Sequence, residues 1–285
     1  MIDYVAMAAS LRVPAGPVDL ASITTDATPG FTGAKKDGEV VLLGMGDPLA
    51  DLQERLFAEG RSGGSRNLLL VLQGMDTSGK GGTLRSTVGL MDPQGVRITS
   101  FKAPTEEERA HDFLWRIAKA LPEAGYVGVF DRSHYEDVLI ARVRSLAPPE
   151  EIERRYDAIN AFEADLVEGG TTIVKCMLHI SPAEQKERLL ARLNHPNKHW
   201  KYNPGDIDER SQWPVYQEAY ELAIERTNTG AAPWHVVPAD RKWYRNLAIG
   251  SLLLAALEDM GPQWPKADFD VAEEKRRLTE EDPLR

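Results

Sequence analysis

The residue types best suited to chemistry lie in a glycine-rich turn that follows an apolar run. The run 68–72 reads Leu-Leu-Leu-Val-Leu, and Gly74, Gly79 and Lys80 then follow. This spacing fits the first seven positions of the phosphate-binding pattern G-x-x-x-x-G-K-[ST]. Glycines let successive backbone N–H groups point at one anion, and a following helix adds partial positive charge at its N-terminus. The turn therefore predicts a phosphate-binding loop whose Lys80 reaches β- or γ-type phosphate oxygens.

Two residues of this loop depart from the pattern. Gly81 stands where Ser or Thr usually supplies a hydroxyl to Mg²⁺, and Asp76 puts a carboxylate among groups that bind anions. Such a charge is unfavourable unless a cation or a proton-transfer step offsets it. We therefore expect Asp76 to hold Mg²⁺ or to orient the phosphate acceptor. The alternative is a glycine-rich turn with a solvated aspartate.

A second candidate group follows the apolar run 127–130. Asp131 ends this run and Arg132 comes next. In phosphate-loop proteins, an apolar strand that ends in Asp delivers a carboxylate beside the loop lysine, where it holds Mg²⁺ directly or through water. We expect that role for Asp131, and Arg132 could reach the oxygens of a transferring phosphoryl group. The alternative is an ordinary structural strand whose last residue is acidic and has no role in a site.

A third candidate group is a basic stretch in an acidic protein. The chain of 285 residues carries a formal net charge of −10, whereas residues 186–202 hold five Lys or Arg against Glu187 alone. A local charge of this kind suggests a polyanion site, and the overall charge argues against general nucleic-acid binding. The Pro-, Asn- and Gly-rich segment 188–213 is typical of a mobile lid that supplies cations and excludes water. An ordinary charged surface loop is the alternative.

The composition indicates a globular protein with 42% hydrophobic and 27% charged residues. Cys176 is the single cysteine, so an internal disulfide and a cysteine-rich metal site are excluded. The first residues lack the basic and apolar regions of a secretory signal, and no stretch has the length of a membrane-spanning helix. We therefore expect a cytoplasmic location with no membrane partner.

Strands that alternate with helices predict a parallel α/β sheet. The expected strands follow the loop segment 61–66 and cover 68–72, 96–101, 127–130, 172–178 and 234–237. The expected helices cover 47–60, the stretch after the phosphate loop to Met91, 105–121, 181–192 and a last helix to Met260. Capping boxes open two of them, at Thr105 and Ser181, and Asp240 is the expected cap of the last helix. Residues 1–45 are expected to be irregular, and 262–285 to form a tail or a surface strap.

With these stretches in hand, the sequence resembles the family-2 polyphosphate kinases from about residue 15 to about residue 260. The most specific matching segments are Gly74-Met-Asp-Thr-Ser-Gly-Lys-Gly-Gly-Thr83, Ser100-Phe-Lys-Ala-Pro104, His111-Asp-Phe-Leu-Trp-Arg116, Phe130-Asp-Arg-Ser-His-Tyr-Glu-Asp137, the lid, Ala232-Pro-Trp234 and Val237-Pro-Ala-Asp-Arg-Lys-Trp243. The resemblance implies a three-layer P-loop kinase fold like that of thymidylate kinase, with a parallel central sheet, a helical lid and an N-terminal extension. It divides the chain into an arm and helix (1–65), a core (66–260) with its lid at about 188–213, and a tail (261–285).

The same resemblance implies Mg²⁺, with Mn²⁺ as an alternative, a basic channel for polyphosphate, and assembly as a homodimer or homotetramer. The metal carboxylates would be Asp76 and Asp131, and the other catalytic residues Lys80, Arg132 and Arg192. The implied phosphate-binding residues are Gly74, Thr77, Ser78, Gly79, Lys80, Gly81, Gly82 and Arg85. The implied nucleotide-binding residues are Arg132, Glu136, Asn194 and Lys198, and the implied channel residues are Lys80, Arg85, Lys201 and Lys242.

The expected reaction is the reversible transfer of a phosphoryl group from polyphosphate to AMP and to ADP, which gives ADP and ATP. His134-Tyr-Glu136 resembles the members that accept both nucleotides, whereas diphosphate-restricted members tend to have Trp-Tyr-Asn there. Gly81, in contrast, is the residue of the diphosphate type. The alternatives are therefore an ADP-specific polyphosphate kinase, an ATP-dependent nucleoside monophosphate kinase, and a nucleotide-binding module without activity.

Overall fold

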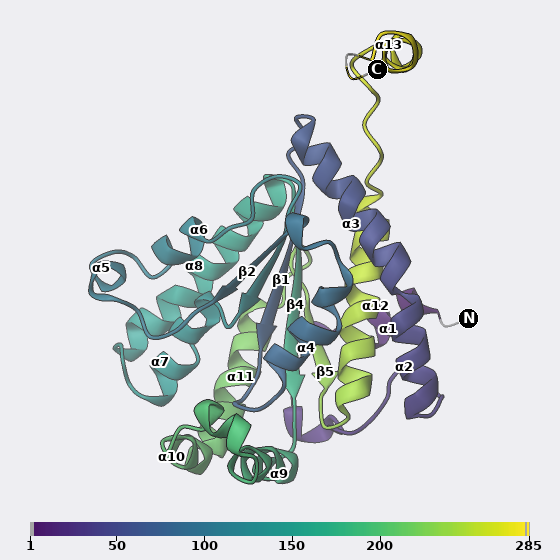
Figure 1. Ribbon diagram of the computed structural model, residues 1–285. Coiled ribbons are helices and arrows are strands. Elements are labelled where there is room, and N and C mark those ends of the chain that lie inside the picture. Colours follow the sequence, from purple (N-terminus) through teal and green to yellow (C-terminus); the bar gives the residue numbers. More distant parts are fainter. Residues whose placement is uncertain (1–2, 283, 285) are drawn as a thin grey trace.

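The computed structural model describes residues 3–282 and 284, and a parallel five-stranded sheet lies at its centre (Figure 1). The strands are β1 (Asn67–Gln73), β2 (Val96–Ser100), β3 (Val127–Asp131), β4 (Thr171–His179) and β5 (Trp234–Pro238), in the spatial order β2-β3-β1-β4-β5. All seven residues of β1 are buried, which explains its almost continuous apolar sequence. The α/β class and all five expected strands are thus confirmed.

The strand order places a crevice at the carboxyl end of the central strand. From β1 the chain crosses to one side for β2 and β3, and it returns to the other side for β4 and β5. Leu72 on β1 pairs in register with Asp131 on β3 and with Cys176 on β4. Ligands of open α/β sheets bind where the chain reverses in this way. The glycine-rich loop after β1 and the Asp131 carboxylate therefore meet at one edge.

Helices cover both faces of the sheet and give a three-layer fold (Figure 1). One face carries α12 (Lys242–Met260), with α1 (Tyr4–Leu11), α2 (Lys35–Gly44) and α3 (Gly46–Arg61) packed around it. The other face carries α8 (Pro149–Glu168) and α11 (Trp213–Thr227). A mostly apolar run of α12, from Leu247 to Leu254, is buried at every position, as expected for a helix between two layers.

Three expectations about the helices were wrong. Residues 1–45 are not irregular throughout, because α1 and α2 form there and pack on α12. The expected helix 105–121 is split into α5 (Glu106–Arg109) and α6 (Trp115–Lys119), since the Asp112 carboxylate accepts from the Leu114 N–H and restarts the turn. Asp240 does not cap α12 but binds Thr25 Oγ1 and the Ser181 N–H, tying the N-terminal segment to the lid.

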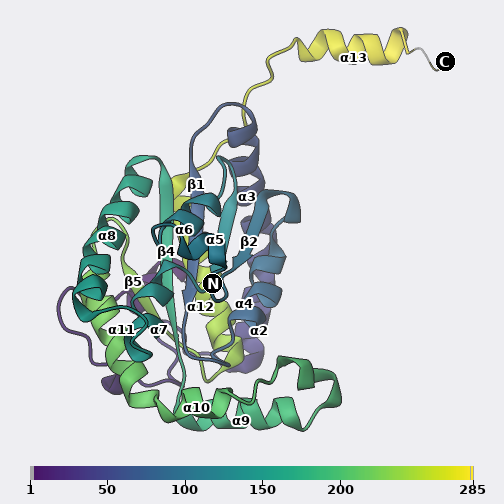
Figure 2. The same cartoon turned by 90° about the vertical axis from the view of Figure 1, so that its left-hand side faces the viewer.

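The lid lies beyond the carboxyl edge of the sheet (Figure 2). It consists of α9 (Pro182–Leu193), the 3₁₀ turn Pro196–Lys201 and α10 (Asp206–Ser211), and it returns through α11. Ser181 caps α9 as expected, although Glu184 binds Arg188 instead of completing the capping box. The C-terminal helix α13 (Val271–Glu280) stands apart from the core at the opposite end, as Figures 1 and 2 show. In the described residues, no helix is long and apolar enough to cross a bilayer.

Candidate active site

The loop between β1 and α4 (Lys80–Ser86) has the backbone conformation of an anion-binding turn. Gly74 and Gly79 take φ values of 147° and 111°, and Thr77 takes 64°, a strained value for a residue with a Cβ. A side chain at Gly79 would be strained at this positive φ, and its Cβ would also lie 1.7 Å from Arg245 Nη1, so glycine is favoured there. Among the described residues, the N–H groups of Gly79, Lys80 and Gly81 have no hydrogen-bond acceptor. They are therefore available to an anion.

Three charged side chains converge at this loop. Lys80 Nζ donates to the Gly74 carbonyl oxygen at 2.7 Å, so the lysine folds over its own loop. Arg132 Nη2 lies 2.9 Å from Asp76 Oδ1 and holds the carboxylate that the sequence placed in the loop. Burial, and to a lesser extent the nearby Arg132 charge, lowers the pKa of Lys80. A phosphate group would stabilise the charged form of this lysine.

The larger of two cavities at the edge is a basic groove of about 690 Å³. Its lining holds ten cationic side chains and two carboxylates, a net charge of +8 in a protein whose overall charge is −10. The cations are Lys80, Arg85, Lys102, Arg132, Arg188, Arg192, Lys198, Lys201, Lys242 and Arg245, and the carboxylates are Asp76 and Asp131. Low-dielectric walls lined by one sign of charge concentrate ions of the opposite sign. The groove therefore suits an extended polyanion.

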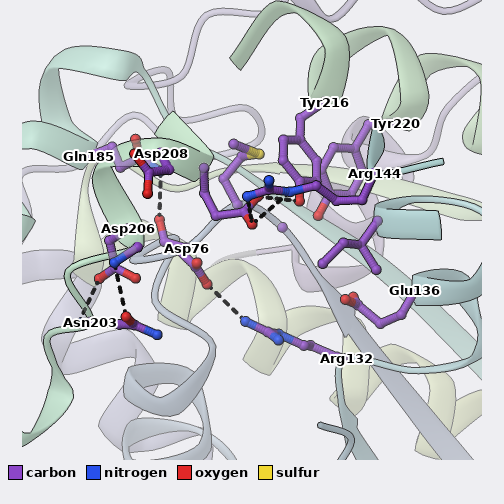
Figure 3. Close-up of a pocket in the computed structure, with 15 residues that line it drawn as sticks. Asp76, Arg132, Glu136, Arg144, Gln185, Asn203, Asp206, Asp208, Tyr216 and Tyr220 are labelled. Atoms are coloured by element: carbon purple, nitrogen blue, oxygen red, sulfur yellow. Dashed lines mark hydrogen bonds and ion pairs between the residues drawn. The ribbon is translucent and has the colours of Figure 1, made fainter. Parts of the chain in front are cut away.

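The smaller cavity, of about 270 Å³, is acidic and partly aromatic (Figure 3). Its charged lining residues are the carboxylates of Asp76, Glu136, Asp206, Asp208 and Glu209 with Arg132 and Arg144, and the rings of Tyr216 and Tyr220 complete it. Burial raises the pKa of Glu136, although Arg132 and Lys80 oppose that shift. With the Gln73 amide oriented to satisfy its neighbours, its nitrogen donates to Glu136 Oε1 at 3.0 Å.

Two residues line both cavities. Asp76 and Arg132 form the ion pair at 2.9 Å, and each contributes to the lining of the groove and of the acidic cavity. A ligand in either cavity therefore reaches the same carboxylate and the same guanidinium. This geometry can bring two anionic groups together across one charged pair.

A divalent cation fits the same place with help from a ligand. Within the part of the chain that the structure describes, no group of three or more His, Cys, Asp or Glu forms a metal site. Asp76 and Asp131 both line the basic groove, and Mg²⁺ usually binds one or two carboxylates together with substrate phosphates and water. Asp76 and Asp131 would thus hold a cation that arrives with phosphate.

Most of the residues expected at the site line one of the two cavities, but two of them line neither. Ser78 lines neither, because its side chain is buried and its N–H donates to Met75 O. Asn194 lies exposed at the end of α9 and also lines neither. Lys198, expected near a nucleotide, lines the basic groove instead. Arg192 lines that groove too, but it is held by Lys201 O at 2.9 Å and Asp206 Oδ2 at 3.4 Å.

Two buried arginines lie behind the loop: Arg188, which was expected only as part of the mobile lid, and Arg245, which was not expected at the site. Arg188 donates to the carbonyl oxygens of Thr77, Ser78 and Asp240 at 2.8–3.0 Å, so it fastens the loop rather than projecting freely from the lid. Arg245 is 3% exposed, and burial together with the Arg188 charge lowers its pKa to about 10. A lone arginine within the apolar sequence of α12 was the signal that could have revealed it.

Comparisons with known proteins agree with this geometry. The family model described as "Polyphosphate kinase 2 (PPK2)" matches residues 34–265. The crystal structure of a polyphosphate kinase 2 from Arthrobacter aurescens superposes with a TM-score of 0.94 and 57% identity, covering 96% of this chain and 97% of that one.

Two curated relatives extend the comparison. The AMP/ADP-polyphosphate phosphotransferase of Meiothermus ruber is 44% identical over 90% of this chain and 94% of its own length. The ADP-polyphosphate phosphotransferase of Rhodopseudomonas palustris is 38% identical over 87% of this chain and 89% of its own. The relatives thus differ in the acceptors that their names give.

Proposed function

This chain belongs to the polyphosphate kinase 2 family, and on that premise we propose that it transfers phosphoryl groups from inorganic polyphosphate to AMP, giving ADP, and to ADP, giving ATP. The chain is an enzyme of this family. The transfer is reversible because a phosphoanhydride bond is broken in the donor and another is formed in the product. We further propose that it acts in the cytoplasm, as a homodimer or homotetramer.

The observation that carries the proposal is the meeting of two cavities at Asp76 and Arg132. The groove of net charge +8 matches the repeated negative charge of polyphosphate. The smaller cavity, with Tyr216 and Tyr220, offers apolar surface to a nucleoside and directs its phosphate to the shared pair.

In this reaction, an oxygen of the acceptor phosphate attacks the terminal phosphorus of polyphosphate. A new P–O–P bond forms to the nucleotide, one P–O–P bond of the donor breaks, and the polymer leaves one unit shorter. Lys80 and the loop N–H groups neutralise the transferred group, and Arg132 spans donor and acceptor. Positioning and charge neutralisation of this kind supply most of the catalysis in phosphoryl transfer.

Asp76 and Asp131 would hold Mg²⁺ during the reaction, and Mn²⁺ is the alternative. The cation would neutralise charge that builds up on the bridging and equatorial oxygens. This role would explain why a carboxylate stands in an anion-binding loop. The cation and Arg132 would offset the negative charge of Asp76, so two anionic substrates could approach it.

Glu136 is the residue that we propose favours AMP. Its carboxylate lines the nucleotide cavity and can accept hydrogen bonds from a ribose hydroxyl. A nucleoside drawn in by such bonds would bring a single phosphate to Arg132. A diphosphate reaches the same place with its second phosphate and depends less on Glu136.

We expect Glu136→Asn to lower kcat/KM for AMP about tenfold more than kcat/KM for ADP, because the lost hydrogen bonds matter most for the shorter acceptor. Steady-state rates with each nucleotide at fixed polyphosphate measure this ratio. The ADP series is the internal control for folding and for donor binding. Equal losses with both nucleotides would remove Glu136 from acceptor selection.

We expect Arg245→Met to raise the KM for polyphosphate about tenfold, because it deletes a buried charge from the groove beside Gly79. Arg241→Met is the matched control, since Arg241 lies near the start of the same helix, is 51% exposed and lines neither cavity. Titration of initial rate against polyphosphate tests both variants. An unchanged KM in Arg245→Met would make this arginine purely structural.

The direct test of the acceptor uses purified protein, Mg²⁺ and long-chain polyphosphate, with AMP in one reaction and ADP in another. Anion-exchange chromatography should show ADP and then ATP from AMP, and ATP from ADP. ATP from ADP together with inert AMP would favour the alternative of an ADP-specific enzyme.

A further inference from the structure

One ion pair joins the lid to the opposite rim of the nucleotide cavity. Arg144, at the end of α7 (Ile140–Val143), donates from Nε to Glu209 Oε1 at 3.1 Å and also from Nη2. The Tyr216 hydroxyl donates to the other oxygen, Glu209 Oε2, at 2.6 Å. All three side chains line the acidic cavity, and Figure 3 shows Arg144 beside Tyr216 and Tyr220.

This pair is a polar connection between the outer lid, residues 194–212, and the core segment that follows β3, while the Tyr216 hydroxyl of α11 supplies another to the same glutamate. In the described part of the chain, the other side-chain hydrogen bonds of residues 194–212 stay within the segment from α9 to α11. Examples are Arg192 with Asp206 and Arg210 with Gln185. Arg144 comes from outside that segment, 65 residues earlier in the sequence than Glu209. The outer lid is therefore fastened across the nucleotide cavity at one point.

The exposure of the pair makes it able to open. Arg144 and Glu209 are 42% and 26% exposed, so solvent screens their attraction and the contact is of modest strength. The pair is nevertheless oriented by the second hydrogen bond of Glu209, and two nitrogens of Arg144 engage one carboxylate oxygen. A contact that is well oriented but weak suits a lid that must open in every catalytic cycle.

We propose that Arg144 and Glu209 are acceptor-positioning residues, whose pairing holds the lid over a bound nucleotide and excludes water from the Asp76–Arg132 junction. The inference rests on the proposed function. It predicts an effect on the acceptor and not on the donor, because Arg144 and Glu209 line the nucleotide cavity and are absent from the lining of the basic groove.

When the lid is not held closed by this pair, a side reaction should occur. Water that enters the junction attacks the terminal phosphorus of polyphosphate in place of the acceptor oxygen. One P–O–P bond breaks, one P–O bond forms to the water oxygen, and a proton is released. The products are orthophosphate and a polymer one unit shorter, so orthophosphate formed per ADP measures how well the lid closes.

The test compares Arg144→Glu, Glu209→Arg and the double charge swap R144E/E209R with the wild type. Each single variant should raise the KM for AMP about fivefold and increase orthophosphate per ADP, with the KM for polyphosphate unchanged. The double variant should restore both quantities to within about twofold of the wild type, since the pair is re-formed with opposite polarity. Glu209→Gln, which keeps the side-chain size, should shift them in the same direction by about twofold.

The matched control is the pair Arg66–Glu59, which is also doubly hydrogen-bonded and is 37% and 28% exposed. It lies at the amino end of β1, away from both cavities, and its charge reversals should leave the two readouts unchanged. Single variants that match this control, or a swap that fails to recover the KM for AMP, would overturn the inference. A wild type that transfers nothing from polyphosphate would instead overturn the proposed function.

Discussion

Asp131→Asn should lower kcat for transfer from polyphosphate to AMP by about 10³-fold while the protein stays folded. Asp131 ends β3 and lines the basic groove that also contains Asp76 and Lys80. Asparagine keeps the shape and the strand but removes the charge with which the residue would hold Mg²⁺. The loss should therefore fall on the chemical step and on metal affinity, and the half-saturating Mg²⁺ concentration should rise.

Rates at increasing Mg²⁺ and a thermal unfolding scan of the same preparation measure these effects. Asp259→Asn is the control, because Asp259 is an exposed aspartate on α12 that lines neither cavity. Near-normal turnover in Asp131→Asn, or the same loss in the control, would exclude Asp131 from the mechanism.

Lys80→Met is the second substitution with a large expected effect, a loss of about 10²- to 10³-fold in kcat/KM with both AMP and ADP. The loss should be shared because Lys80 would contact the transferred group, which comes from polyphosphate with either acceptor. Methionine has a similar length and no charge. Burial, and to a lesser extent the nearby Arg132 charge, lowers the pKa of Lys80, so the protonated lysine does not stabilise the folded protein without ligand. The unfolding temperature of Lys80→Met should therefore not fall.

Steady-state kinetics with both acceptors and calorimetry check this pair of statements. Lys36→Met, which removes an exposed lysine of α2 outside both cavities, provides the control. A loss confined to one acceptor would contradict a role on the transferred group. An unfolding temperature lowered enough to account for the lost activity would make Lys80 a structural residue.

Much of the central fold could be predicted because the determinants are local. The apolar run of β1, the glycines of the loop and the terminal Asp131 are adjacent in sequence, and five such strand patterns define the sheet. The Gly74–Gly79–Lys80 spacing also predicted where the candidate site lies, because these residues line the two cavities. No helix was expected over 149–168 or 213–227, although α8 and α11 form there and cover one face of the sheet.

What could not be predicted depends on contacts between distant segments. Arg245 reaches the phosphate loop only because α12 packs beside α4, and the Arg144–Glu209 pair joins residues 65 positions apart. Asp240 looked like a helix cap, yet it binds Thr25, 215 residues away. The residues that line the acidic cavity come from several segments, including the loop, α7, α10 and α11, so no single stretch of sequence identifies it.

The most direct test of the central claim compares the two donors at the same acceptor. Purified protein with Mg²⁺ and AMP receives long-chain polyphosphate in one reaction and ATP in the other, and the nucleotides are followed by chromatography. We expect ADP and then ATP with polyphosphate, at an initial rate far above that with ATP, because the extended groove of net charge +8 suits a long polyanion. ADP that forms only in the reaction with ATP would contradict it and would identify an ordinary nucleoside monophosphate kinase.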